Sequence, residues 1–309
     1  MGPAGPDVAK ISACIVCRNE GDRLGPCLAS IDWVDEILLL DLSSSDDSIA
    51  VAARYGARVI RRDAVPVVEM VRNEVASLAS WDWILVLDPD ERVTPGLAQE
   101  LRRASENAAL AAVVMPRMNY DLGYPPSSAV HRYEPQLRMY RRSRVKWPTV
   151  PNAYPNVPAE FTYRVPARDE LVLVHDRSRT ISEVLDRSVR YAPIQAQSMV
   201  EQGQVFTARG MFFALCRVAH KEFIVAQAWR DGVPGMLRAS LLLGFKFYVW
   251  AAFWQVSSGQ RTAADDRFVG RLGIGLGAVG RAWRMLRGVR KVFASSQVPP
   301  ERPVPTRRD

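Results

Sequence analysis

Two aspartates separated by a single residue, Asp88 and Asp90, are the pattern in this sequence best suited to chemistry. They follow the apolar run WILVL of residues 83–87. Two carboxylates at this spacing in a turn can hold one divalent cation, and hard oxygen ligands select Mg²⁺ or Mn²⁺. With that metal the pair could clamp a diphosphate and stabilise a leaving group. The alternative is a pair of aspartates that cap a turn before a helix.

A second polar segment also follows an apolar run. Asp41 ends the run of residues 36–41, and the loop LSSSDDS of residues 42–48 comes next. Hydroxyl and backbone N–H groups at the start of a helix suit a phosphate or a nucleoside, which makes Ser43 and Ser45 candidates. Asp41 could accept a hydrogen bond from a base N–H or a ribose hydroxyl. An ordinary helix-capping loop is the alternative.

Two further strand ends deliver polar groups. Asn19 and Glu20 come directly after the apolar run of residues 11–17, and His175 follows the run of residues 170–174. His175 could be a third metal ligand or a contact to an acceptor. A histidine that only stabilises the strand end is the alternative.

The elements that must position these residues alternate through the first ninety positions. Candidate strands span residues 11–17, 36–41, 57–61 and 82–88, and candidate helices span residues 21–32, 46–55 and 67–80. Strand alternating with helix predicts a parallel α/β sheet with right-handed crossovers. Ligands bind beyond the carboxyl ends of such strands. We therefore expect residues 18–20, Asp41 and Asp88 at one edge of the sheet.

Periodicity weakens further along the chain. We expect a helix over residues 95–107, a strand over 111–115, a strand over 170–174 that ends at His175, and a helix over 179–203. Residues 116–168 are rich in Pro, Tyr and Arg, which favours an irregular, substrate-facing region.

Charge is distributed unevenly. Residues 1–260 carry 30 Lys/Arg and 29 Asp/Glu, whereas residues 261–309 carry 11 and 4. The body of the protein lacks the basic bias of a nucleic-acid-binding fold, so we expect no nucleic acid partner. The basic end favours the phosphates of an anionic membrane surface.

Residues 211–257 are apolar and aromatic. Arg238 and Lys246 interrupt a stretch that approaches the ~20 residues of a membrane span, which favours a re-entrant or interfacial helix. A soluble core helix is the alternative. In residues 281–293 an apolar stripe runs beside arginines, which is typical of a basic amphipathic helix on a membrane surface.

The order of four motifs carries a family resemblance. CRNE, WVDEILLLDLSSSDDS, YGARVIRR and WDWILVLDPDERVTPGL, all within residues 10–105, resemble the nucleotide-binding half of family 2 glycosyltransferases. They are most similar to the branch that contains lipopolysaccharide-core and related glycan transferases. A weaker similarity continues through residues 134–138, His175, Tyr191 and residues 231–235.

The resemblance implies a GT-A fold, which is Rossmann-like with a mostly parallel central sheet flanked by helices. It also implies a nucleotide-sugar donor, a divalent metal and inversion at the anomeric carbon. By position, Glu20 and Asp41 would contact the nucleoside, and Asp88 and Asp90 would hold the metal and the diphosphate.

Inversion requires a general base near the acceptor hydroxyl. Glu91, Glu134, Glu160 and Asp169 are candidates, and we favour Glu91 or Glu134.

The sequence also departs from the branch. Asp47 replaces the usual glycine of the serine loop, and Pro89 lies inside the aspartate pair. Residues 149–161 lack the branch's His-Glu pair.

Taken together, the sequence predicts a metal-dependent inverting glycosyltransferase of cell-envelope polysaccharide biosynthesis. It would use Mg²⁺ or Mn²⁺ and act on a glycan or lipid-linked acceptor, in the cytoplasm at the inner face of the cell membrane. A soluble small-molecule acceptor, or a catalytically weak glycan- or membrane-binding module, are the alternatives. The expected organisation is a flexible start (1–9), a GT-A domain (10–205, with halves 10–118 and 119–205), a hydrophobic helical region (206–260), a basic amphipathic helix (261–294) and a disordered tail (295–309).

Overall fold

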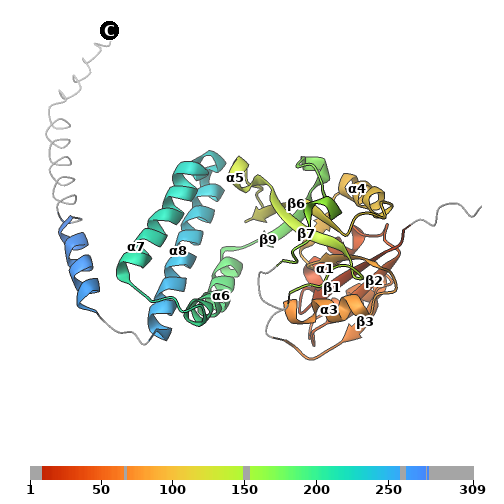
Figure 1. Ribbon diagram of the computed structural model, residues 1–309, viewed down its shortest axis with the longest axis horizontal. Coiled ribbons are helices and arrows are strands. Elements are labelled where there is room, and N and C mark those ends of the chain that lie inside the picture. Colours follow the sequence, from red (N-terminus) through yellow and green to blue (C-terminus); the bar gives the residue numbers. More distant parts are fainter. Residues whose placement is uncertain (1–8, 66–67, 149–153, 258–261, 276, 278–309) are drawn as a thin grey trace, which may run out of the picture. The chain divides into compact units, whose positions relative to one another are not determined.

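A computed structural model of the chain describes residues 9–65, 68–148, 154–257, 262–275 and 277 (Figure 1). Contacts within the chain divide it into two compact units. The first contains residues 1–188 and 219–242, and the second contains residues 189–218 and 243–309. All strands of the described residues belong to the first unit. The domain boundaries expected from the sequence stay a prediction.

The first ninety residues form the alternating pattern that the sequence predicts. The elements are β1 (Ile11–Cys17), α1 (Gly21–Ala29), β2 (Glu36–Asp41), α2 (Ser48–Arg54), β3 (Arg58–Arg61), α3 (Glu69–Ser77) and β4 (Trp83–Leu87). The strands are parallel in the order β3-β2-β1-β4. All of β4 is buried because helices cover both faces of the sheet, as expected for a continuous apolar run.

The rest of the sheet is mixed. It contains β5 (Glu91–Val93), β6 (Ala112–Asp121), β7 (Glu134–Arg141), β8 (Thr162–Arg164) and β9 (Leu173–Ser178), with α4 (Pro95–Ser105) after β5. The full order is β3-β2-β1-β4-β7-β6-β9-β5, and β8 pairs with β6. Five of the eight neighbouring pairs are parallel. The predicted α/β class with a mostly parallel sheet is confirmed.

Two details differ from the sequence-based expectation. The segment 116–168 is not irregular throughout, because it contains β7, β8 and half of β6. The inner strand β7 escaped prediction because it buries Gln136 and Arg138 along with its apolar residues. The last predicted strand begins later and continues past His175 to Ser178, since the N–H of Asp176 donates to the backbone oxygen of Asp90 (2.9 Å).

The sheet curls. β4 lies inside the strand order and β5 at its end, yet Leu87 and Glu91 are only four residues apart. Four residues span at most about 14 Å, so the end of the sheet returns toward β4. The turn of Asp88 and Asp90 closes this gap, and it therefore lies between the parallel and the mixed parts of the sheet.

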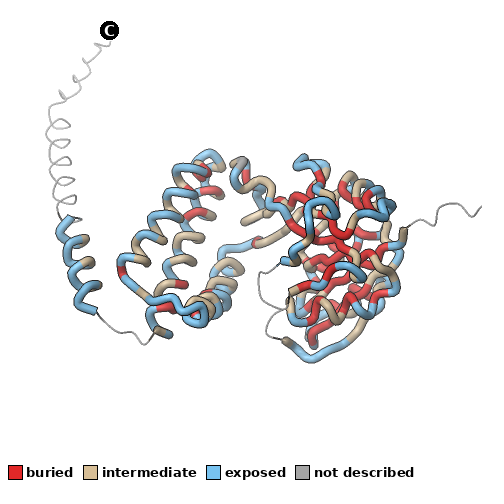
Figure 2. The backbone as a smooth tube through the Cα atoms, in the orientation of Figure 1, coloured by how far each residue is buried: buried red, intermediate tan, exposed pale blue. Residues whose placement is uncertain are grey.

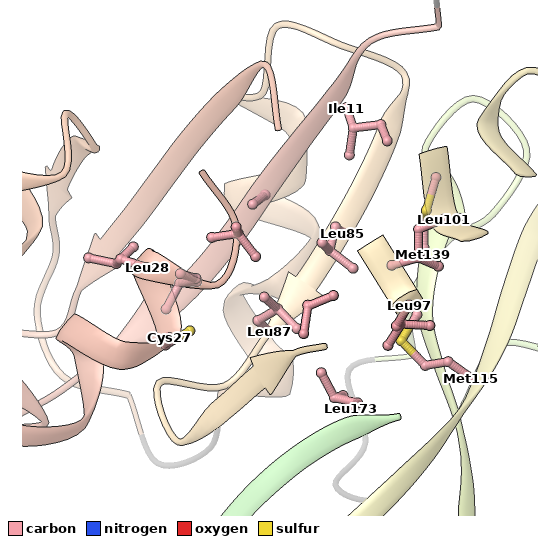
Figure 3. Close-up of a cluster of buried hydrophobic side chains, with 14 of the residues drawn as sticks. Ile11, Cys27, Leu28, Leu85, Leu87, Leu97, Leu101, Met115, Met139 and Leu173 are labelled. Atoms are coloured by element: carbon pink, nitrogen blue, oxygen red, sulfur yellow. The ribbon is translucent and has the colours of Figure 1, made fainter. Parts of the chain in front are cut away.

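Apolar side chains pack on both faces of the sheet. On one face, α1, α2 and α4 contribute residues such as Leu28, Leu97 and Leu101, which meet strand residues such as Leu85 and Met139 (Figure 3). The other face is covered by α3. Burial concentrates in these strands, as Figure 2 shows. Each buried leucine contributes roughly 1.5–3 kcal/mol, so the core holds the strand ends rigidly.

Helices dominate the C-terminal part. They are α6 (Ile181–Glu201), α7 (Ala208–Ala219), a π-helix (His220–Val225), a 3-10 turn (Ala228–Asp231) and α8 (Gly232–Val256). In the second unit, Ala196, Ala252 and Phe253 form a small core. By length and composition, Ala228–Val256 is apolar enough to cross a membrane, and 22% of its most apolar window is buried. Most of the basic amphipathic helix predicted at 261–294, and the tail at 295–309, lie outside the described residues.

Candidate active site

The loops after β1 and β2 lock onto each other. The backbone N–H of Asn19 donates to Ser44 Oγ (2.9 Å), and the N–H of Ser45 donates to Asn19 Oδ1 (2.7 Å). Asn19 and Ser43 have φ angles of 55° and 57°, in the left-handed region that non-glycine residues seldom adopt. Such strained residues collect at functional sites, and here the cross-loop bonds hold them in place.

Asp41 ends β2 with one unsatisfied oxygen. Its Oδ2 accepts the N–H of Ser44 (3.1 Å), while Oδ1 is buried without a hydrogen-bond partner among the described residues. The side chain borders a pocket of about 530 Å³, which is lined by Asp41, Ser43, Ser44, Arg61, Arg62 and Asp63. An unsatisfied buried acceptor costs roughly 1–3 kcal/mol, so a ligand N–H or O–H that reached Oδ1 would be favoured. Ser43 Oγ instead donates to the backbone oxygen of Arg62 (3.0 Å).

Glu20 and Gly21 join this loop to α1. The N–H of Glu20 donates to Ser48 Oγ (3.1 Å), and the N–H of Gly21 donates to Asp46 Oδ2 (2.9 Å). A Cβ at Gly21 would lie 2.0 Å from Oδ1 of Asp47. The aspartate that departs from the branch pattern therefore packs against the start of α1.

Asp88 lies between two arginines. Its Oδ2 accepts from Arg138 (2.5 Å) and its Oδ1 accepts from Arg72 (3.3 Å). Burial alone would raise the pKa of Asp88, but Arg138 and Arg72 hold that pKa well below its usual value. Asp88 is therefore a fixed anion whose oxygens are both engaged.

Glu91 belongs to the same ionic network. Its side chain is completely buried, and its Oε1 accepts from Arg138 (2.6 Å) and Arg117 (3.1 Å). Its Oε2 accepts the N–H of Asp88 (3.0 Å). Both oxygens thus stabilise the turn that carries the two aspartates.

Glu134 is the more open of the two base candidates. Its side chain is 46% exposed, and Oε2 accepts from Arg117 (2.7 Å) and Asn119 (2.8 Å). No group among the described residues donates to Oε1. Burial would raise the pKa of Glu134, but Arg117 and the hydrogen bonds lower it below its usual value. The carboxylate is therefore ionised at neutral pH, with one oxygen available.

Asp90 and His175 face each other across the β5–β9 pair. Asp90 Oδ2 and His175 Nε2 are 3.3 Å apart. The other ring nitrogen, Nδ1, lies 2.7 Å from Asn119 Oδ1, and the Asn119 amide donates to Glu134 through its nitrogen. Nδ1 therefore carries a proton, and Nε2 presents a lone pair to a carboxylate unless a proton or a metal ion lies between them.

This pair fits a divalent cation. Carboxylate oxygen suits Mg²⁺ and Mn²⁺, and imidazole nitrogen is a common ligand of divalent transition metals. The hydrogen bond from Nδ1 to Asn119 fixes the ring, as is usual for histidines that bind metals. In the part of the chain that the structure describes, no group of three His, Cys, Asp or Glu is arranged to hold a metal. Further ligands would therefore come from substrate oxygens or water.

Two of the predicted acidic residues, Glu20 and Asp90, lie near the same arginine. Arg23 of α1 links the two loops, with its guanidinium 4.0 Å from Glu20 and 3.7 Å from Asp90. Sequence reasoning missed the partners Arg23, Arg72, Arg117 and Asn119. The only available signal was a polar residue inside an apolar pattern, such as Arg72 next to Val71 in α3.

Residues 12–160 match the model of "Glycosyl transferase family 2". The chain is 25% identical over 256 residues to the lipopolysaccharide core biosynthesis glycosyltransferase LpsC of Rhizobium meliloti, which covers 79% of this chain and 92% of the relative. An uncharacterized glycosyltransferase of Rickettsia felis is 26% identical, covering 77% of this chain and 87% of the relative. A TPR repeat-containing protein of Synechococcus elongatus is 34% identical over 44% of this chain, a match that spans only 35% of that relative.

Among solved structures, the chain is similar to the mannosyltransferase PcManGT of Pyrobaculum calidifontis, in complex with GDP-Man and Mn²⁺. That structure is 14% identical with a TM-score of 0.41, and the match covers 93% of this chain and 88% of that chain. The similarity to S. aureus TarS has 12% identity and a TM-score of 0.40, and it covers 81% of this chain and 92% of that chain.

Proposed function

We propose that this chain, whose residues 12–160 match the model of glycosyl transferase family 2, is a metal-dependent inverting enzyme with a nucleotide-diphosphate sugar donor. The observation that supports it is the Asp90–His175 pair, whose Oδ2 and Nε2 are 3.3 Å apart and could both bind one cation. A glycan or lipid-linked molecule is the proposed acceptor.

Asp90 and His175 would hold Mn²⁺ or Mg²⁺, which supplies positive charge to a departing diphosphate. Asp88, predicted as a metal ligand, is proposed to fix the turn instead, since both of its oxygens accept from arginines. The unsatisfied Oδ1 of Asp41 would accept a hydrogen bond from the nucleoside in the adjacent pocket. Ser43 lines that pocket. Asn19, Glu20 and Ser45 are proposed to support its loop through the hydrogen bonds described above.

Glu134 is the proposed general base. Its open Oε1 would remove the proton from the acceptor hydroxyl as the hydroxyl oxygen attacks the anomeric carbon, on the face opposite the leaving diphosphate. Attack from that face inverts the configuration. Glu91 has no oxygen to spare for this step, and it is proposed to position Asp88 and Arg138.

Thermal melting tests the donor site directly. The wild-type chain should melt at a higher temperature with UDP, GDP or dTDP in the presence of Mn²⁺, because a ligand at a hundredfold excess over its Kd stabilises by about 2.7 kcal/mol. Asp90→Asn should lose the metal dependence, whereas Asp32→Asn, which alters an exposed aspartate on the loop after α1, should keep it. No shift with any nucleotide would favour a catalytically weak binding module.

We further propose that the enzyme works at the cytoplasmic face of the cell membrane. Phe247 and Trp254 of α8 are about half exposed, and residues 261–309 carry 11 basic and 4 acidic residues. An exposed apolar helix followed by basic residues suits an anionic bilayer surface. The full chain should float with liposomes that contain an anionic lipid and less with neutral ones. Failure to float with either would favour a soluble acceptor.

A further inference from the structure

Three arginines from three elements gather near Asp90. Arg23 of α1 places Nη1 3.7 Å from Asp90 Oδ2, and Arg177 lies two residues beyond His175 on β9. Arg187 of α6 donates from Nη2 to the backbone oxygen of Arg177. All of these residues belong to the first unit.

Two of the three have acidic partners. Arg23 pairs with Glu183, and Arg177 Nη1 is 3.7 Å from Asp121 Oδ2. Arg187 differs, because no carboxylate among the described residues lies within ion-pair distance of it. Within the described residues its guanidinium makes one hydrogen bond, which uses a single N–H of the five that a guanidinium offers.

The surroundings of Arg187 disfavour an isolated cation. Burial lowers the pKa of Arg187, and the positive charge of Arg177 lowers it further, with only partial compensation from Asp90 and Asp121. A partly desolvated guanidinium without a counter-charge is costly for a folded chain. An anion that bound there would repay that cost.

We propose that Arg187, with Arg177 beside it, anchors a phosphate-binding site next to the Asp90–His175 pair. The planar guanidinium can donate two parallel hydrogen bonds to two phosphate oxygens. An arginine that already donates this pair to a carboxylate cannot. The inference extends the proposed function, in which two substrates can bring phosphate. One source is the diphosphate of the donor, and the other is a phosphate carried by the acceptor.

Isothermal titration of the full chain with inorganic phosphate, without metal, tests the site. Arg187→Gln should weaken phosphate binding about tenfold or more, because it removes a charge-assisted pair. Arg187→Lys keeps the positive charge but lacks the planar guanidinium, so its phosphate affinity should lie between those of the wild type and Arg187→Gln. Arg168→Gln removes an exposed arginine of the same unit and should bind phosphate as the wild type does. Equal phosphate affinity in wild type and Arg187→Gln would overturn the proposal.

Melting without ligand separates a binding role from a structural one. Since Arg187 lacks an acidic partner, Arg187→Gln should melt at the wild-type temperature or above, while losing the rise that phosphate causes. A melting temperature several degrees below wild type for both Arg187→Gln and Arg187→Lys would mean that the residue holds the fold, which contradicts the proposal.

A competition experiment identifies the source of the phosphate. If UDP or GDP with Mn²⁺ displaces inorganic phosphate, and Arg187→Gln weakens the diphosphate but not the nucleoside, the site serves the donor. If phosphate still binds in an Arg187-dependent way with the diphosphate in place, the site serves the acceptor. A wild type that binds phosphate through Arg187 but no nucleotide would refute the proposed donor and leave the phosphate site standing.

Discussion

Asp88 and Asp90 are two residues apart in one turn, yet their surroundings are opposite. Asp88 is held between Arg138 and Arg72, in a network that includes the completely buried Glu91. Asp90 Oδ2 instead lies 3.3 Å from Nε2 of His175. Asp88 accepts hydrogen bonds from two arginines, whereas Asp90 Oδ2 has the more distant guanidinium of Arg23 at 3.7 Å and the His175 ring at 3.3 Å. The contrast supports the proposal that Asp88 stabilises the turn and that Asp90 binds the cation.

The largest effect is expected on stability, in the buried ion-pair network of Asp88 and Glu91. Arg138→Gln removes the shared partner of Asp88 and Glu91, and leaves a buried carboxylate short of counter-charge. Breaking such a pair costs about 3–5 kcal/mol, which chemical denaturation would measure as a fall in the free energy of unfolding.

A matched control is Arg103→Gln, which removes an arginine that is 69% exposed and paired with Glu100. Its effect should stay within about 1 kcal/mol, because surface pairs contribute little. Similar losses in Arg138→Gln and Arg103→Gln would show that the buried network contributes no more than a surface pair.

The next effect distinguishes the two glutamates. Glu134→Gln should lower kcat about a hundredfold or more, since a positioned general base contributes at least that much, and should leave the free energy of unfolding nearly unchanged. Glu91→Gln should mainly lower the free energy of unfolding, because both carboxylate oxygens of Glu91 accept hydrogen bonds inside the protein. Steady-state kinetics beside denaturation curves would test this. A Glu91→Gln variant that is stable but inactive would move the base to Glu91.

The contrast between Asp88 and Asp90 also explains which features of the site could be predicted from the sequence. The parallel strands and the acidic residues at their ends could be predicted, because apolar runs mark buried strands and the acids follow them directly. The arginine partners could not, since Arg138 reaches Asp88 across 50 positions and Arg72 reaches it across 16. β7 was missed for the same reason, because the strand that supplies Arg138 carries this charge on a buried position. Long-range ion pairs leave no local periodicity.

The smallest effect is expected on Mn²⁺ affinity when Asn119, the hydrogen-bond partner of His175, is changed. Asn119 accepts from His175 through Oδ1 and donates to Glu134 through its nitrogen, so it sets which ring nitrogen of His175 faces Asp90. Asn119→Ala should weaken Mn²⁺ binding about tenfold, as changes to outer-shell partners usually do, and should alter the free energy of unfolding little. Titration of the full chain with Mn²⁺ would measure the affinity, with Asn107→Ala in the exposed turn after α4 as the control. Unchanged Mn²⁺ affinity in Asn119→Ala would mean that His175 needs no hydrogen bond to Asn119 to face Asp90. The difference between the two aspartates would then not extend to the residues that surround His175.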